Sequence, residues 1–212
     1  MKKSIGTKAV AFPTPNFIVG TYDESGKPNA MSVAWGGMCC GDPMCVGITL
    51  REATYTYGNL MKRKAFTISV PSEKYIKEAD YFGIVSGRKE DKFAATGLTP
   101  VRSDLVDAPY VKEFPVVLEC SVIKTVLLGL HTLFIGQVKD VKVDEEMLKS
   151  GSPVLKKTKP MIFSPVDHAY YGIGRYLGDA FSEGKKIRKQ TEDLHGTRKS
   201  CRPCVRDGNG KK

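Results

Sequence analysis

The stretch 86–93 brings together the chemical groups that hold a phosphate. It contains Ser86, Gly87, Arg88 and Lys92. Phosphate oxygens accept charge-assisted hydrogen bonds from cations and hydroxyls, and glycine lets backbone approach closely. Basic octamers with a glycine are also common on solvated surfaces, so this stretch alone identifies no site. A phosphorylated cofactor is therefore the first hypothesis, and other motifs must support it.

A second stretch, residues 29–35, places polar residues among small ones on a predicted strand. Small side chains let a flat ligand lie against the backbone, whose N–H and C=O groups then bind ring nitrogens and carbonyls. The alternative is an ordinary barrel strand with its tryptophan in the core. The candidate ligand contacts in this stretch are Asn29, Ala30, Met31, Ser32 and Trp35.

A third stretch, residues 49–57, runs from a strand end into a helix start. It supplies Thr49, Arg51 and the hydroxyls of Thr54 and Thr56. Helix starts favour anions because their N–H groups are free and the helix dipole is positive there. The alternative is that Thr54 or Thr56 only caps the helix.

The composition is that of an ordinary globular protein. The 212 residues are 41% hydrophobic and 26% charged, enough for one large domain with a buried core. No run approaches the roughly 18 apolar residues that a membrane span needs. Lys8, Pro13 and Pro15 interrupt any apolar segment of signal-peptide type. We expect no membrane partner and a cytoplasmic location.

The positive charge is concentrated at one end of the chain. The net charge is +10, and residues 185–212 contain ten Lys or Arg against three acidic residues. The remaining body is mildly basic, so a phosphate pocket accounts for its charge. A nucleic-acid-binding barrel is the rival from another class, but no aromatic side chains interleave with a cationic stripe, which disfavours it.

Six cysteines in a cytoplasmic chain predict free thiols rather than a disulfide framework. Cys39, Cys40 and Cys45 offer at most three ligands, and we interpret them as small hydrophobic residues in a turn. Cys201 and Cys204 form a CxxC motif and are weak candidates for a zinc site or a reactive dithiol. We otherwise expect no metal.

Short alternating segments separated by turn residues predict a mainly β fold with inserted helices. Antiparallel strands of this kind favour a small closed or partly closed barrel over a doubly wound sheet. We expect a domain over residues 1–184 and a flexible basic tail over 185–212. The predicted strands are 17–22, 30–35, 45–50, 65–70, 116–127 and 131–143, and the predicted helices are 54–62, 71–82 and 91–95.

Taken in order over residues 12–181, these motifs resemble the flavin reductase-like family, and within it the flavoredoxins. The resemblance is far more specific than any single motif because all of them occur in sequence. They are Asn29-Ala30-Met31-Ser32 with Trp35, Thr49-Leu50-Arg51 with Thr56-Tyr57, Ser86-Gly87-Arg88 with Asp91-Lys92-Phe93, Leu118-Glu119-Cys120, and the HTLFIGQV segment that begins at His131.

The resemblance implies an antiparallel split β-barrel, usually a homodimer, that binds FMN noncovalently. It implies that Asn29, Ala30, Met31, Ser32 and Trp35 border the isoalloxazine, that Arg51, Thr56, Ser86 and Lys92 approach the phosphate, and that Thr49 also belongs to the site. His131 would lie beside the flavin or an incoming nicotinamide. Phe163 would cover the ring system from its other face or from a partner subunit.

The resemblance leaves two functions open. The preferred one is an NAD(P)H-dependent flavin oxidoreductase, and the alternative is a non-enzymatic electron carrier between ferredoxin-like partners. In both cases the redox chemistry belongs to the flavin, so no catalytic residue is expected. The alternative interpretation of Cys39, Cys40 and Cys45 is that one of these thiols tunes the flavin or relays electrons.

Overall fold

The computed structural model describes residues 1–187. Contacts divide the chain into residues 1–173 and residues 174–212. The predicted boundary after residue 184 stays a prediction, and Cys201 and Cys204 lie outside the described residues. No helix within residues 1–187 is long and apolar enough to cross a membrane. The cytoplasmic location stays a prediction.

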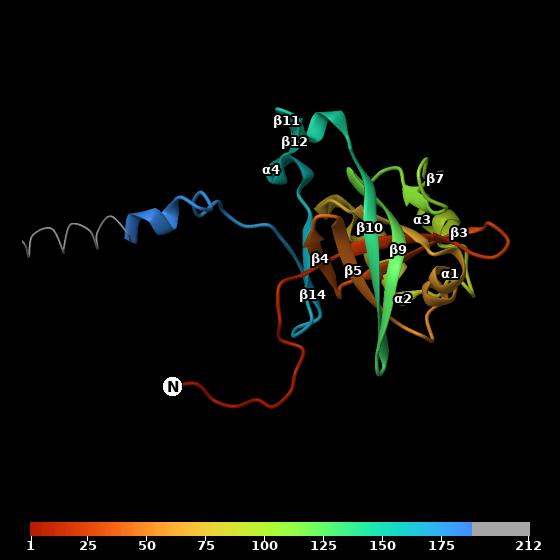
Figure 1. Ribbon diagram of the computed structural model, residues 1–212, viewed down its shortest axis with the longest axis horizontal. Coiled ribbons are helices and arrows are strands. Elements are labelled where there is room, and N and C mark those ends of the chain that lie inside the picture. Colours follow the sequence, from red (N-terminus) through yellow and green to blue (C-terminus); the bar gives the residue numbers. More distant parts are fainter. Residues whose placement is uncertain (188–212) are drawn as a thin grey trace, which may run out of the picture. The chain divides into compact units, whose positions relative to one another are not determined.

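A seven-stranded antiparallel sheet forms the body of the first unit (Figure 1). Its strand order is β3-β2-β6-β9-β10-β5-β4. This confirms the predicted mainly β, antiparallel fold with inserted helices. The strands are β2 (Phe17–Tyr22), β3 (Pro28–Val33), β4 (Gly36–Gly41), β5 (Met44–Arg51), β6 (Ala65–Val70), β9 (Val116–Leu128) and β10 (His131–Val143).

The sheet curls into a barrel that is split on one side. β3 is the last strand at one end of the hydrogen-bonded order, yet it contacts β5 near the other end. The two strands do not pair in a ladder, so the barrel is open between them. The outer edge of β3 therefore keeps backbone N–H and C=O groups without a strand partner.

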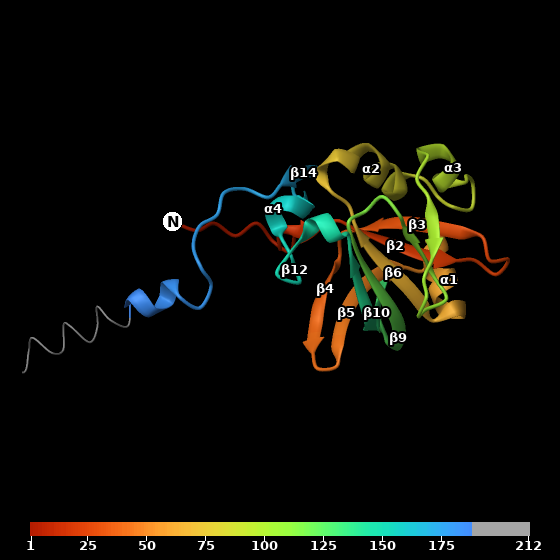
Figure 2. The same ribbon diagram turned by 90° about the horizontal axis from the view of Figure 1, so that it is seen from above.

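Helices inserted between the strands cover β2 and β3. α1 (Tyr55–Arg63) contacts β2, while α2 (Ile76–Ile84) and α3 (Lys92–Thr96) contact β3 (Figure 2). A short 3-10 turn, η1 (Glu73–Tyr75), leads into α2. Thr54 caps α1 by accepting a hydrogen bond from the Tyr57 N–H, so its predicted capping role is confirmed.

Strand β2 separates two apolar cores. Successive residues of a strand point to opposite faces. Val19 accordingly packs inside the barrel, whereas Ile18 packs under α2 and α3. The barrel core includes Val46, Ile48, Leu50, Phe66, Ile68 and Phe134, and the second core includes Ala30, Ala79, Phe82, Phe93 and Phe114.

Strand β4 was not predicted, because its three glycines have low β-propensity. Cys39 and Cys40 lie on this strand and Cys45 lies on β5, so the interpretation of residues 39–45 as a turn is wrong. The turn is limited to residues 42–43.

Shorter strands complete the fold. β1 (Thr14–Pro15), β13 (Met161–Ser164) and β14 (Ala169–Gly172) form a three-stranded sheet. Two strand pairs are β7 (Pro100–Arg102) with β8 (Pro109–Val111) and β11 (Leu148–Lys149) with β12 (Ser152–Pro153). Within residues 1–173, the remaining short helices are η2 (Glu145–Met147) and α4 (Leu155–Thr158).

Candidate functional site

Two adjoining pockets lie at the split of the barrel. The inner pocket, of about 320 Å³, is bounded by β3, the start of α1 and the segment from α2 to α3. The outer pocket, of about 180 Å³, is bounded by β3, β5 and the start of β10. Met31, Arg51 and Thr54 line both pockets, so one elongated ligand can occupy the two.

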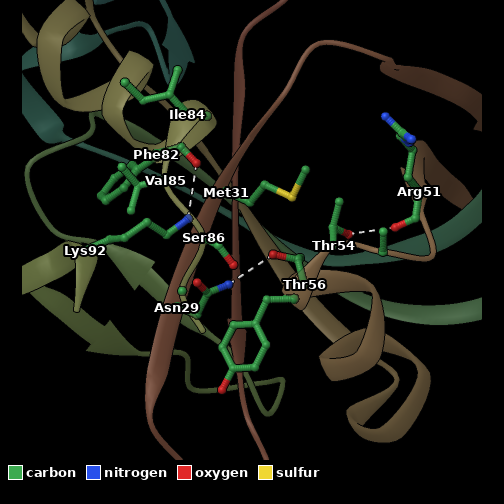
Figure 3. A pocket seen from close by; sticks show the side chains of 14 residues that line it. Asn29, Met31, Arg51, Thr54, Thr56, Phe82, Ile84, Val85, Ser86 and Lys92 are labelled. Carbon is green, nitrogen blue, oxygen red and sulfur yellow. Dashed lines mark hydrogen bonds between the residues drawn. The ribbon is translucent and has the colours of Figure 1, made fainter. Parts of the chain in front are cut away.

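Most of the predicted site residues line these two pockets. The inner pocket is lined by Asn29, Met31, Arg51, Ala53, Thr54, Tyr55, Thr56, Phe82, Gly83, Ile84, Val85, Ser86, Gly87 and Lys92 (Figure 3). The outer pocket is lined by Met31, Ser32, Val33, Ala34, Trp35, Thr49, Leu50, Arg51, Thr54 and His131. Residues as far apart in the sequence as Asn29 and His131 thus line one pair of adjoining pockets.

Lys92 is a buried cation on the wall of the inner pocket. It begins α3 and its residue surface is only 4% exposed. Its Nζ donates a hydrogen bond to the carbonyl oxygen of Phe82 over 3.2 Å (Figure 3). Burial lowers the pKa of Lys92 to about 8, and no nearby carboxylate raises it. The inner pocket therefore presents a positive charge that has no counterion within residues 1–187.

Asn29 and Thr56 place further hydrogen-bonding groups in this pocket. The Asn29 Nδ2 donates to the Thr56 Oγ1 over 3.0 Å, which leaves the hydroxyl proton of Thr56 free for another acceptor. The Asn29 Oδ1 is buried and has no partner among the described residues. A ligand with both acceptors and donors would satisfy the two groups.

The loop after α2 closes tightly around the pocket. A Cβ atom at Gly87 would lie 2.8 Å from the Tyr55 Cδ1, so any larger residue would have to displace its neighbours. Ser86 accepts a hydrogen bond from the Arg88 N–H over 3.3 Å. The Arg88 guanidinium turns to the Ala53 carbonyl oxygen, 2.8 Å away, and to the Tyr55 ring. Arg88 therefore connects the loop after α2 to the residues at the start of α1, at the edge of the inner pocket.

The start of α1 faces the same pocket. Tyr55 and Thr56 both line it, and the first N–H groups of a helix have no intrahelical acceptor. The Thr54 hydroxyl donates to the Arg51 carbonyl oxygen over 2.9 Å, which joins the end of β5 to the helix. These N–H groups and Lys92 approach the pocket from different elements and together favour an anion.

The outer pocket is bordered by an aromatic pair, an exposed tryptophan and a half-buried histidine. The rings of Trp35 and His131 lie 4.7 Å apart at an angle of 31°. Thr49 fixes the tryptophan backbone, because its N–H and Oγ1 both donate to the Trp35 carbonyl oxygen at 2.9 and 3.0 Å. Trp35 is 47% exposed, so it lies outside the barrel core. A planar group can lie between this pair and the edge of β3.

Three predicted contacts have other surroundings. Ser32 lines the outer pocket, but its hydroxyl donates to the Asn16 Oδ1 over 2.7 Å. Ala30 is fully buried in the second core, so only its backbone can border the site. Phe163 lines a separate pocket with Phe12 and its neighbours. The roles of these residues in ligand binding stay predictions.

Several pocket residues were not predicted. Phe82, Gly83, Ile84 and Val85 close one side of the inner pocket where α2 ends. Their sequence pattern is that of an ordinary apolar helix end, which does not indicate a binding site. The glycine beside Ser86 was noted, but its close approach to Tyr55 depends on the folded loop.

The fold and the pockets together define a split-barrel protein whose site suits a flat ligand with an anionic end. Residues 9–168 match the model of the flavin reductase like domain. The chain therefore belongs to the flavin reductase-like family, as its motifs indicated. It is a flavin-binding redox protein of the flavin reductase and flavoredoxin type.

Solved structures and a curated relative agree with this assignment. Flavoredoxin of Desulfovibrio vulgaris (Miyazaki F) is 52% identical, with a TM-score of 0.83 over 87% of this chain and 100% of that one. Flavoredoxin from Methanosarcina acetivorans is 28% identical, with a TM-score of 0.83 over 88% and 99%. The high molecular weight rubredoxin of Moorella thermoacetica is 30% identical over 150 residues, which are 70% of this chain and 62% of that protein.

Proposed function

We propose that the protein binds FMN noncovalently, with the phosphate in the inner pocket and the isoalloxazine in the outer pocket. The observation that carries this proposal is Lys92, a buried cation that lies on the wall of a pocket and has no counterion among the described residues. A phosphate supplies the missing charge and accepts several hydrogen bonds. FMN also has a flat ring system, which suits the slot beside Trp35 and His131.

The residues of the inner pocket fit a phosphate and the sugar-like chain that carries it. Lys92, the free hydroxyl proton of Thr56 and the first N–H groups of α1 are donors for phosphate oxygens. The unpartnered Asn29 Oδ1 is an acceptor for a ribityl hydroxyl. The close packing at Gly87 leaves the phosphate near backbone.

The flavin, when bound, supplies the redox chemistry, and the protein supplies position and access. The outer edge of β3 offers backbone groups to the ring nitrogens and carbonyls. Trp35 is half exposed, so one side of the proposed ring site is open to a second molecule. The proposal therefore needs no proton-transferring side chain from this chain.

We propose NADH or NADPH as the electron donor, which makes the protein a flavin oxidoreductase. Support comes from the open slot beside His131 and from membership of a reductase-like family. The test is to mix the FMN-loaded protein with NADH or NADPH without oxygen and to follow flavin absorbance. We expect bleaching with at least one nucleotide. Unchanged absorbance with both would exclude the reductase function.

Electron carriage between redox proteins is the second candidate. It is favoured by the 52% identity to a protein named flavoredoxin and by the similarity to a high molecular weight rubredoxin. Reduction of the bound flavin by a reduced ferredoxin, with no reduction by nicotinamide nucleotides, is the result expected for a carrier. Reduction by nucleotides alone would contradict it.

We also propose that the protein is a homodimer through the outer face of β9 and β10. Leu128 is exposed, and Val126, Leu133 and Ile135 are half-buried on this face beside His131. Lys124, opposite Ile135, is the charged residue among these strand partners, and a largely apolar face continuous with the ligand site is typical of an interaction surface. Sedimentation at several protein concentrations should show a dimer. Leu133→Lys should shift it toward monomer, and a wild-type monomer would contradict the proposal.

A further inference from the structure

A pair of thiols faces across the hairpin of β4 and β5. Cys40 on β4 lies directly opposite Cys45 on β5, next to the turn at residues 42–43. Both cysteines are free, as is their neighbour Cys39. In Figure 2 this hairpin tip lies at the end of the two strands that is remote from α2 and α3. The pair is therefore separate from the inner pocket.

The geometry of this pair suits a disulfide. Directly opposed residues of antiparallel strands have Cα atoms about 4.5–5.5 Å apart, and disulfides span Cα distances of about 4.4–6.8 Å. Opposed residues also point to the same face of the sheet. The Cys40 thiol lies close enough to Cys45 to help raise the pKa of the Cys45 thiol. Oxidation thus requires no rearrangement of the strands.

The two thiols differ in their exposure to solvent. This difference sets the order in which they react with an oxidant. Cys40 is exposed, and its Sγ also donates to the Asp42 carbonyl oxygen over 3.4 Å. Cys45 is only 3% exposed, and burial together with the neighbouring thiols of Cys40 and Cys39 raises its pKa. An oxidant therefore meets Cys40 first, and Cys45 is placed to react second.

We propose that Cys40 and Cys45 are a reversible oxidation site that a peroxide converts into a cross-strand disulfide. The Cys40 thiolate attacks hydrogen peroxide, so an S–O bond forms, the O–O bond breaks and water leaves after taking up a proton. The Cys45 sulfur then attacks the Cys40 sulfur, so the S–S bond forms and the S–O bond breaks. The hydroxide that leaves takes the Cys45 proton and becomes water. Two thiols and one peroxide give one disulfide and two waters.

Other described cysteines are poor alternatives. Cys120 is fully buried in the barrel core, and burial raises its pKa to about 12, which keeps it as an unreactive thiol. Cys39 lies where the register between the strands shifts, and it has no directly opposed residue on β5. These features make Cys39→Ser the matched control for a change at Cys40.

The test uses the full chain with Cys201→Ser and Cys204→Ser, so that only the thiols of the described residues react. After treatment with hydrogen peroxide under non-denaturing conditions, peptide mass spectrometry should show loss of two hydrogen atoms from the peptide containing residues 39–45. A thiol reductant should restore the original mass. Fragmentation should assign the bond to Cys40 and Cys45.

The variants separate this proposal from its alternatives. Cys40→Ser and Cys45→Ser should each reduce disulfide formation at least about tenfold, while Cys39→Ser should leave it unchanged. A bond between Cys39 and Cys45, a bond between two chains, or peroxide treatment that yields only overoxidised thiols would each overturn the proposal. Circular dichroism of every variant checks that the barrel is intact.

Discussion

The inner and outer pockets adjoin each other but are built in opposite ways. The inner pocket is lined by buried polar and charged groups, including the ammonium of Lys92 and the Asn29 Oδ1, which has no partner among the described residues. The outer pocket is bordered by the half-exposed ring of Trp35 and the half-buried ring of His131, and none of its described lining residues is a buried charge. Under the proposed function, the inner pocket supplies affinity for FMN and the outer pocket supplies access to its ring.

This division has a thermodynamic consequence for the ligand-free protein. A buried cation without a counterion is destabilising, and an anionic ligand removes that penalty on binding. The polar groups of the inner pocket are therefore arranged for a ligand rather than for the stability of the barrel. Replacing these groups should raise the stability of the ligand-free protein and lower its affinity for FMN. Changes in the outer pocket should have only small effects on both quantities.

The largest expected effect follows from Lys92→Met, which keeps the length of the side chain and removes its charge. FMN binding should weaken by roughly 10- to 100-fold because a charge-assisted hydrogen bond to phosphate is lost. The ligand-free variant should be more stable than the wild type by roughly 1–3 kcal/mol. Fluorescence titration with FMN and urea unfolding measure the two quantities. Lower stability with unchanged affinity would give Lys92 a purely structural role.

The pH dependence of stability and of FMN binding tests the same role of Lys92. The folded pKa of Lys92 is lowered to about 8 from an ordinary value of 10.5. Unfolded chains therefore bind more protons between these values, and the stability of the ligand-free protein should rise with pH across this window. Bound phosphate raises the pKa of Lys92, so binding takes up a proton above pH 8 and affinity should fall.

Titrations at several pH values check this expectation. From pH 7 to pH 9, FMN affinity should fall by about tenfold. Lys92→Arg is the control, because arginine stays charged and its variant should bind FMN with no such decline. An equal decline in both proteins would assign the pH dependence to another group.

Gly87→Ala tests how closely the loop must approach the inner pocket. The added Cβ would clash with the Asn29 Oδ1 and would lie 2.8 Å from the Tyr55 Cδ1. We expect the substitution to lower the free energy of unfolding by about 1 kcal/mol and to weaken FMN binding about fivefold.

Gly58→Ala is the matched control, since a Cβ there meets no atom within 4 Å. That change within α1 should stabilise the protein by about 0.5–1 kcal/mol and leave FMN binding unchanged. Equal effects of the two substitutions on FMN affinity would contradict the account.

Trp35→Leu should have the smallest effect on affinity. Trp35 is half exposed and its backbone is held by Thr49, so FMN binding should change by less than about threefold. The rate of flavin reduction should change more than the affinity, because this residue borders the open side of the proposed ring site. Stopped-flow absorbance measures the rate. A large loss of affinity with an unchanged rate would contradict the division between the pockets.

The sequence predicted the elements whose patterns are local. Thr54 was recognised as a possible helix cap, and the long paired strands β9 and β10 followed from their alternation and the glycine turn between them. Strand β4 was missed because glycines give no strand signal, although pairing with β5 holds it in the sheet. The apolar end of α2 was missed as a pocket wall because that role depends on β3 and α1, which lie far away in the sequence.

Preference for the phosphate of FMN tests the central claim most directly. Riboflavin has the same ring system without the phosphate, so the ratio of its dissociation constant to that of FMN isolates the inner pocket. Wild-type protein should prefer FMN by about tenfold or more, and Lys92→Met should lose most of this preference while binding riboflavin as before. Equal binding of FMN and riboflavin by the wild type, or a preference that Lys92→Met leaves intact, would contradict the account.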